Sequence, residues 1–161
     1  MKGIVSFIFV FLVLLSCDSP KNRASFLSGR VTHIVDGDTY DVLLDGEQVR
    51  IRMEGIDAPE RGQDYYKKSK EYLGELCMWQ EVRVEGTKKD RWGRLIAKTY
   101  NQSNQELGEL MIMAGMAWHF KEYSDDITLS KLETEAREAG LGLWSIDNPT
   151  PPWEKRKKRK S

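Results

Sequence analysis

The chain has 161 residues, which is enough for one domain with a core that stabilises itself, and we expect no second domain. Its 25 basic and 25 acidic residues balance, but the neutral total hides an asymmetry. Residues 17–153 carry 18 basic against 24 acidic residues, a net charge of −6, whereas residues 154–160 carry six basic against one acidic, a net charge of +5.

The first sixteen residues predict a secretory signal peptide. Lys2 precedes an almost unbroken apolar run that is too short and too close to the N-terminus for a comfortable membrane span. The run ends in Leu14-Leu15-Ser16-Cys17, which resembles the bacterial lipobox, where the cysteine is lipidated and becomes the new N-terminus. Residues 17–26 would then be a lipidated tether. The alternative is an ordinary signal peptide with a chance cysteine at this boundary.

Cys17 and Cys77 are the only cysteines in the chain. If Cys17 carries lipid, Cys77 has no intramolecular partner, so an oxidising compartment does not imply a disulfide here. We expect Cys77 to be buried in a helix as a small hydrophobic residue without a chemical role.

Residues 27–35 open the domain with a β-branched run that predicts a first strand. Asp36-Gly37 forms the turn after it. Residues 39–53 then alternate apolar and polar side chains around Asp45-Gly46, a two-residue turn signal, and predict a β-hairpin.

The turn also predicts the register of the hairpin. If Asp45-Gly46 are the two loop residues, Asp41 faces Arg50 and Thr39 faces Arg52. Asp41 and Arg50 can then satisfy each other across the strands. Arg52 has no such partner and projects near Asp38.

The remaining elements follow in order. Residues 63–79 predict a helix, and residues 81–85 and 94–100 predict a pair of strands. Residues 107–114 predict a short helix. A last helix is expected to be capped by Asp126 or Thr128 and to end at Gly140. Residues 149–161 are expected to be a disordered basic tail that binds either nucleic acid or anionic lipid, if it is not merely solvated. Periodicity alone predicts an α+β fold.

Three separated motifs carry a family resemblance. The sequence D-G-D-T at 36–39, followed by R-x-x-x-x-D-x-P-E at 52–60, resembles the thermonuclease family typified by staphylococcal nuclease. D-R-W-G-R-L at 90–95 resembles the second arginine motif of that family, and A-x-x-x-G-L-G-L-W at 136–144 resembles its end. The resemblance implies a five-stranded Greek-key barrel, the OB-fold, with three helices over residues 27–148.

The resemblance also implies site residues and chemistry. The metal ligands would be Asp38, Asp57 and the backbone carbonyl of Ala58, and the metal would be Ca²⁺, whose loose geometry accepts water and carbonyl oxygens. Glu60 would be the general base, and Arg52 and Arg94 would clamp the phosphate in the transition state. The alternative for Arg94 is a structural bridge to Asp90.

The implied substrates are DNA and RNA, cleaved to 3′-phosphate products. Arg91 corresponds to a generally basic position that would touch the phosphate backbone, and Tyr123 would pack beside a bound nucleotide unless it is a structural tyrosine. We expect His33 and His119 to be strand-surface histidines without a catalytic role, because the family resemblance places no catalytic histidine there. We expect a monomer.

Together these features predict an exported, calcium-dependent nuclease anchored as a cell-envelope lipoprotein on the periplasmic or extracellular face of a bacterial membrane. One alternative is a non-catalytic nucleic-acid-binding barrel lipoprotein, and another is a lipoprotein that uses the barrel as a protein or lipid adaptor. The presence of Asp38, Arg52, Asp57, Glu60 and Arg94 together favours the enzyme.

Overall fold

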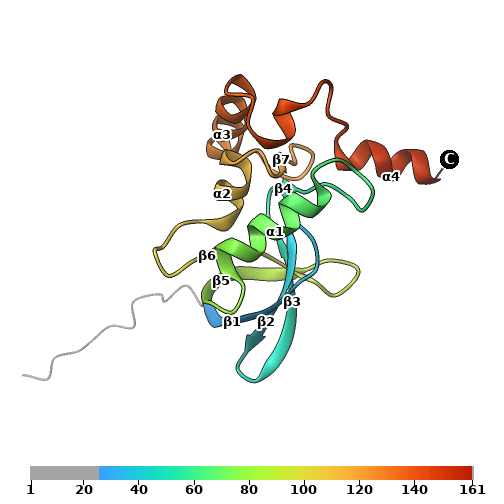
Figure 1. Cartoon of the computed structure of the whole chain (residues 1–161). Helices are drawn as coiled ribbons and strands as arrows, with labels where there is room; N and C mark the ends of the chain where they lie inside the picture. Colours follow the sequence, from blue (N-terminus) through green and yellow to red (C-terminus); the bar gives the residue numbers. More distant parts are fainter. Residues whose placement is uncertain (1–25, 161) are drawn as a thin grey trace, which may run out of the picture.

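A computed structural model describes residues 26–160, and its centre is a closed β-barrel (Figure 1). The barrel strands are β1 (Leu27–Ile34), β2 (Thr39–Leu44), β3 (Glu47–Met53), β5 (Glu81–Lys89) and β6 (Leu95–Tyr100). They are hydrogen-bonded in the closed order β1-β2-β3-β6-β5, in which β3 and β6 are parallel and every other pair is antiparallel. This arrangement confirms the predicted five-stranded barrel.

The hairpin of β2 and β3 has the predicted register. Asp41 lies opposite Arg50, and Thr39 lies opposite Arg52. The turn residues Asp45 and Gly46 have φ values of 49° and 85°, as a tight two-residue hairpin requires. Arg50 donates from Nε and Nη2 to the two Asp41 oxygens at 2.7 and 3.0 Å, so this cross-strand pair is satisfied internally.

The core fills the barrel and continues beneath the helices. The inward positions of the strands are fully buried, among them Val31, Tyr40, Ile51 and Val84. The Tyr40 hydroxyl forms a 2.7 Å hydrogen bond with Thr99 Oγ1, which satisfies the polar groups of both buried side chains.

Three helices lie outside the barrel, at positions near those predicted. They are α1 (Tyr66–Cys77), α2 (Leu107–Met113) and α3 (Ile127–Glu138). Asp126 caps α3, because its Oδ1 accepts hydrogen bonds from the backbone N–H groups of Thr128 and Leu129. Cys77 is fully buried in α1 as predicted, and burial raises the pKa of its thiol to about 12.

Short elements connect the helices and strands. β4 (Ile56–Asp57) pairs with β7 (Trp118–His119), and the 3₁₀ helix η1 (Gly142–Ser145) follows α3. His119 is buried, not on a strand surface as expected, because its ring packs where both nitrogens meet hydroxyls, 3.1 Å from Ser124 Oγ and 3.0 Å from Ser130 Oγ.

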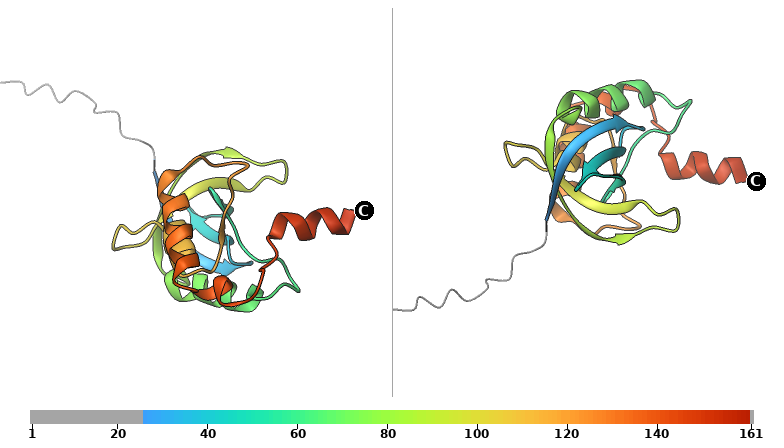
Figure 2. Two further views of the ribbon diagram at one scale, coloured as in Figure 1. Left: turned by 90° about the horizontal axis from the view of Figure 1, so that it is seen from above. Right: turned by 90° about the horizontal axis from the view of Figure 1, so that it is seen from below.

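The predicted tail differs from the structure. Residues expected to be disordered form a fourth helix, α4 (Pro152–Lys160), which projects from the body of the domain (Figures 1 and 2). Pro152 lies in the first turn of this helix, where a missing N–H costs no hydrogen bond. The physical reason is anchorage: Trp153 stacks on Phe120, with ring centroids 5.4 Å apart and planes inclined by 4°.

Among the described residues, no helix is long and apolar enough to cross a membrane. The predicted signal peptide and the predicted lipidation site Cys17 lie outside the described residues.

Candidate active site

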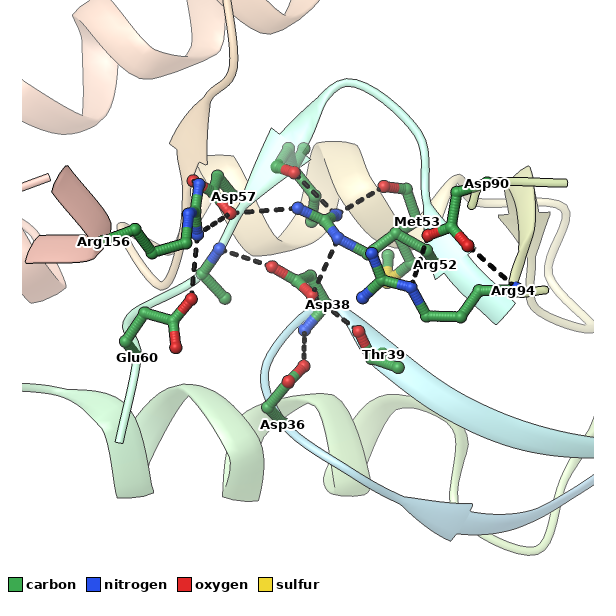
Figure 3. Close-up of polar contacts among 12 residues, drawn as sticks. Asp36, Asp38, Thr39, Arg52, Met53, Asp57, Glu60, Asp90, Arg94 and Arg156 are labelled. Carbon is green, nitrogen blue, oxygen red and sulfur yellow. Dashed lines mark hydrogen bonds and ion pairs between the residues drawn. The ribbon is translucent and has the colours of Figure 1, made fainter. Parts of the chain in front are cut away.

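The residues predicted to carry the chemistry, Arg94 apart, come from neighbouring segments of the first half of the chain. Asp38 lies immediately before β2, Arg52 lies on β3, and Asp57 ends β4, with Glu60 in the loop that follows (Figure 3). Thr39 pairs with Arg52 in the hairpin, so the register itself holds Asp38 beside that arginine.

Asp38 is held in place at both carboxylate oxygens. It is only 5% exposed; its Oδ1 accepts a 2.8 Å hydrogen bond from Thr39 Oγ1, and its Oδ2 accepts a 2.7 Å bond from the Ala58 backbone N–H. The preceding turn is pressed against α1, where a Cβ on Gly37 would lie 1.9 Å from Ser69 Oγ. Only glycine therefore allows the turn to present Asp38 in this position.

Arg52 is partly buried and contacts several groups of the site. Its Nη1 donates to the carbonyls of Met53 and Ile56 at 2.7 and 2.8 Å, and its Nη2 donates to Asp57 Oδ1 at 3.0 Å. Its Nε lies 3.3 Å from an oxygen of Asp38. Two carbonyls thus lock one edge of the guanidinium, and the Nε and Nη2 side faces the carboxylates.

The carboxylates of the site repel one another. Burial raises the pKa of Asp57, the ion pair with Arg156 opposes that rise, and the charge of Asp38 adds to it. Burial and the charge of Asp38 also raise the pKa of the neighbouring Asp36 to about 7. An additional positive charge is therefore favourable beside Asp38 and Asp57.

Glu60 lies at the more open side of the site, and its side chain is 33% exposed. Its backbone N–H donates to Gln63 Oε1 at 2.8 Å, which ties the loop to the residues before α1. Its carboxylate accepts a 2.9 Å hydrogen bond from Arg156 Nη1.

Arg94 forms a local ion pair, and its side chain also points toward the site. Its Nε donates to Asp90 Oδ2 at 2.6 Å, as the structural alternative predicts. Figure 3 also shows its side chain reaching toward Arg52 and Asp38. The parallel pairing of β3 with β6, in which Arg52 faces Ile96, explains why the two arginines share one end of the barrel. The ion pair with Asp90 therefore orients Arg94 rather than directing it elsewhere.

The two predicted nucleic-acid contacts lie on different loops. Tyr123 is 72% exposed and packs against Phe120, with ring centroids 4.7 Å apart. Arg91 lies over the ring of Trp92 at 4.1 Å, in the turn that leads to Arg94. Trp92 is 66% exposed and was not identified from the sequence, although an aromatic residue between two arginines was a usable signal.

Arg156 is the second residue that the sequence did not reveal. It comes from α4, and its Nη2 donates to Asp57 Oδ2 at 2.6 Å while its Nη1 lies 3.2 Å from Asp57 Oδ1. Its charge pairs with Asp57 and Glu60 at once (Figure 3). The usable signal was Pro151-Pro152-Trp153, a helix start with an aromatic anchor directly before the basic run.

The donor set fits a hard divalent cation that takes part of its shell from outside the side chains. Asp38 and Asp57 supply buried carboxylate oxygens, and the Asp38–Ala58 hydrogen bond brings the Ala58 backbone alongside. Within residues 26–160, no group of three or more His, Cys, Asp or Glu side chains is arranged to hold a metal by itself. Backbone carbonyls or water would have to complete the shell.

Comparison with known proteins identifies the family. Residues 50–146 match the family model described as staphylococcal nuclease homologue. The chain is 39% identical over 127 residues to an "Uncharacterized endonuclease" of Escherichia coli, covering 79% of this chain and 83% of that protein. It is 36% identical over 158 residues to an "Uncharacterized endonuclease" of Haemophilus influenzae, covering 98% and 85%.

A third relative is the "Micrococcal nuclease" of Shigella flexneri, which is 36% identical over 143 residues, covering 83% of this chain and 82% of that protein. The match to the family model covers more than half of the chain, and it spans the segment that carries Arg52, Asp57, Glu60 and Arg94. The chain therefore belongs to the staphylococcal nuclease family and is a nuclease, a hydrolase of phosphodiester bonds.

Proposed function

We propose that this nuclease is calcium-dependent and hydrolyses both DNA and RNA to products that end in a 3′-phosphate. The observation that carries the proposal is the convergence of two buried carboxylates, Asp38 and Asp57, with Arg52 and the more exposed Glu60 at one end of the barrel. A phosphodiester gains negative charge in its transition state, so a site of this kind has to supply positive charge and a base.

Asp38 and Asp57 would hold the Ca²⁺, with the Ala58 carbonyl and water completing its shell. When bound, the cation neutralises charge on a phosphate oxygen. Arg52 would meet the phosphate with its Nε and Nη2 edge, since its Nη1 is committed to two carbonyls. That edge faces Asp38 and Asp57, so a cation on these carboxylates would release it toward the phosphate. Arg94, oriented by Asp90, binds the phosphate from the β6 side.

Glu60 takes the role of general base in this proposal. Its carboxylate is the most exposed of the three acidic groups predicted for the site, so a water molecule can reach it. It would orient that water toward phosphorus and accept its proton. The five side chains then have separate tasks: Asp38 and Asp57 hold the cation, Glu60 activates water, and Arg52 and Arg94 bind the phosphate.

The test is a digestion of linear DNA and of RNA by the purified full chain with Ca²⁺, Mg²⁺ or chelator. We expect cleavage of both substrates with Ca²⁺ and none with chelator. The DNA products should be extended by a polymerase only after treatment with a phosphatase, because a 3′-phosphate blocks extension. Undiminished cleavage in chelator, or products that are extended directly, would refute the calcium requirement or the product assignment respectively.

We also propose that the protein is exported and anchored by a lipid on Cys17, on the strength of the apolar run and the lipobox-like residues before it. Cells fed a radiolabelled fatty acid should incorporate the label into the wild-type chain and not into Cys17→Ser. Equal labelling of the two chains would contradict the anchor.

A further inference from the structure

The contact between α4 and the candidate site links segments that lie about a hundred residues apart in the sequence. Arg156 meets both oxygens of Asp57, at 3.2 and 2.6 Å, and one oxygen of Glu60, at 2.9 Å. Asp57 is 2% exposed, whereas the side chain of Arg156 is 32% exposed. Helix α4 therefore brings the positive charge of a partly exposed arginine, Arg156, against the almost completely buried carboxylate of Asp57.

The first turn of α4 holds this contact in place. Lys155 Nζ donates to the Arg61 carbonyl at 2.6 Å, and Trp153 stacks on Phe120. Just before the helix, Gln63 Nε2 donates to the Thr150 carbonyl at 2.8 Å. The rest of the helix projects away from the domain (Figure 2). The contacts named here and the buried Pro152 lie outside the hydrophobic core of the barrel, so the helix can detach without unfolding the barrel.

The atoms that Arg156 uses are the ones that the cation site needs. Both Asp57 oxygens accept from its guanidinium, so a cation bound to Asp57 must replace at least one of these hydrogen bonds. The positive charge that these carboxylates favour is supplied, in this arrangement, by the protein itself. A guanidinium and a divalent cation at the same oxygens also repel each other, which makes the two states exclusive.

We propose that Arg156 is an internal competitor for the divalent cation, so that α4 sets the cation concentration at which this nuclease becomes active. The inference rests on the proposed cation site at Asp38 and Asp57. In the cation-free protein, Arg156 neutralises Asp57 and Glu60 and occupies one oxygen of the general base. Binding of the cation displaces Arg156, and that Glu60 oxygen is then free to accept a proton from water.

Calcium binding to the full chain, measured by isothermal titration calorimetry in mild detergent, tests the competition directly. Arg156→Gln should lower the Kd for Ca²⁺ about tenfold, because the cation no longer has to break a charge-assisted pair. The matched control is Arg159→Gln, which makes the same charge change three residues further along α4 at an exposed position. It should keep the Kd within about twofold of the wild type.

The thermal unfolding temperature with and without Ca²⁺ gives a second, independent readout. Without cation, Arg156→Gln removes one of the two guanidinium partners of Asp57 and leaves only Arg52 among the described ones, so the Tm should fall, while saturating Ca²⁺ should restore it to the wild-type value. The Tm increase on adding Ca²⁺ is therefore expected to be larger in Arg156→Gln than in the wild type or in Arg159→Gln.

Equal Kd values for the wild type and Arg156→Gln would overturn the inference and leave the proposed cation site standing. Weaker binding by Arg156→Gln, or an equal shift in both variants, would overturn it as well. If none of the three proteins binds Ca²⁺, the proposed cation site itself fails and the inference fails with it.

Discussion

Arg52 and Asp57 form a buried ion pair, with 3.0 Å between Nη2 and Oδ1 and side chains that are 14% and 2% exposed. The same guanidinium binds the carbonyls of Met53 and Ile56, at the end of β3 and on β4. An arginine predicted to act only on substrate is therefore also the residue that joins β3 to β4.

Arg52→Gln is expected to lose both activity and stability. Cleavage should fall at least about a hundredfold, because a transition-state contact is removed. The free energy of unfolding should also fall by about 3 kcal/mol, because two carbonyls and a buried carboxylate lose their partner. Initial rates on DNA and urea denaturation measure the two effects. A variant of wild-type stability would show that these contacts do not support the fold.

Glu60→Gln is expected to separate activity from stability. The amide keeps the shape of the side chain but cannot accept a proton at neutral pH, so kcat should fall about a hundredfold or more. Glu60 is partly exposed, and its loop is also held through the backbone by Gln63, so the urea midpoint should stay close to that of the wild type. A kcat near the wild-type value at saturating Ca²⁺ would remove Glu60 from the chemistry.

The ion pair between Asp90 and Arg94 predicts a coupled effect. Asp90→Asn keeps an oxygen for the backbone N–H groups of Trp92 and Arg94 but loses the charge that holds the guanidinium. We expect kcat/KM to fall about tenfold in Asp90→Asn and about a hundredfold or more in Arg94→Gln, with the double variant no worse than Arg94→Gln alone. Additive losses in this double-mutant cycle would mean that Asp90 does not act through Arg94.

Tyr123→Ala is expected to weaken substrate binding with little effect on the chemical step. The ring is exposed beside Phe120 and offers a face on which a base can stack. Stacking contributes roughly 1–3 kcal/mol per base, so KM should rise about tenfold. Tyr123→Phe keeps the ring and should behave as the wild type. If Ala and Phe at this position gave the same KM, stacking would be ruled out.

Stability should decrease as the solution is acidified below neutral pH because of His119. Burial lowers the pKa of this histidine below its ordinary value of 6.5, so the folded protein binds fewer protons than the unfolded chain in that range. The resulting stability is present above pH 6.5 and is lost as the pH falls toward the lowered pKa. His119→Gln should therefore show a shallower dependence of Tm on pH between 7 and 5. Parallel curves for the two proteins would exclude this origin.

Local sequence patterns were sufficient to predict how several residues of the site lie relative to one another. The Asp45-Gly46 turn determines the pairing of Thr39 with Arg52, because a two-residue loop allows only one register. The position of Asp38 follows from that register. The sequence motif also located Asp90 beside Arg94, since the two residues belong to one turn.

The hydrogen bonds of Arg52 to Met53 and Ile56 could not be predicted in the same way. They depend on how the chain bends at Gly55, where φ is +74°, and on the pairing of β4 with β7. The sequence therefore predicts an Arg52 guanidinium without protein partners, whereas in the structure this guanidinium contacts two carbonyls and two carboxylates.

The sequence by itself determined the hairpin, the nuclease motifs and the order of the site residues, because hairpin turns, strand alternation and short motifs are local properties of a chain. The barrel was expected from the family resemblance that those motifs carry. Only the tertiary structure decided that the basic end of the chain folds into α4 and brings Arg156 to Asp57, 99 residues away. Such a contact depends on where Trp153 finds an aromatic surface and where a buried carboxylate, already paired with Arg52, can accept a second guanidinium. Both conditions exist only after the barrel has formed.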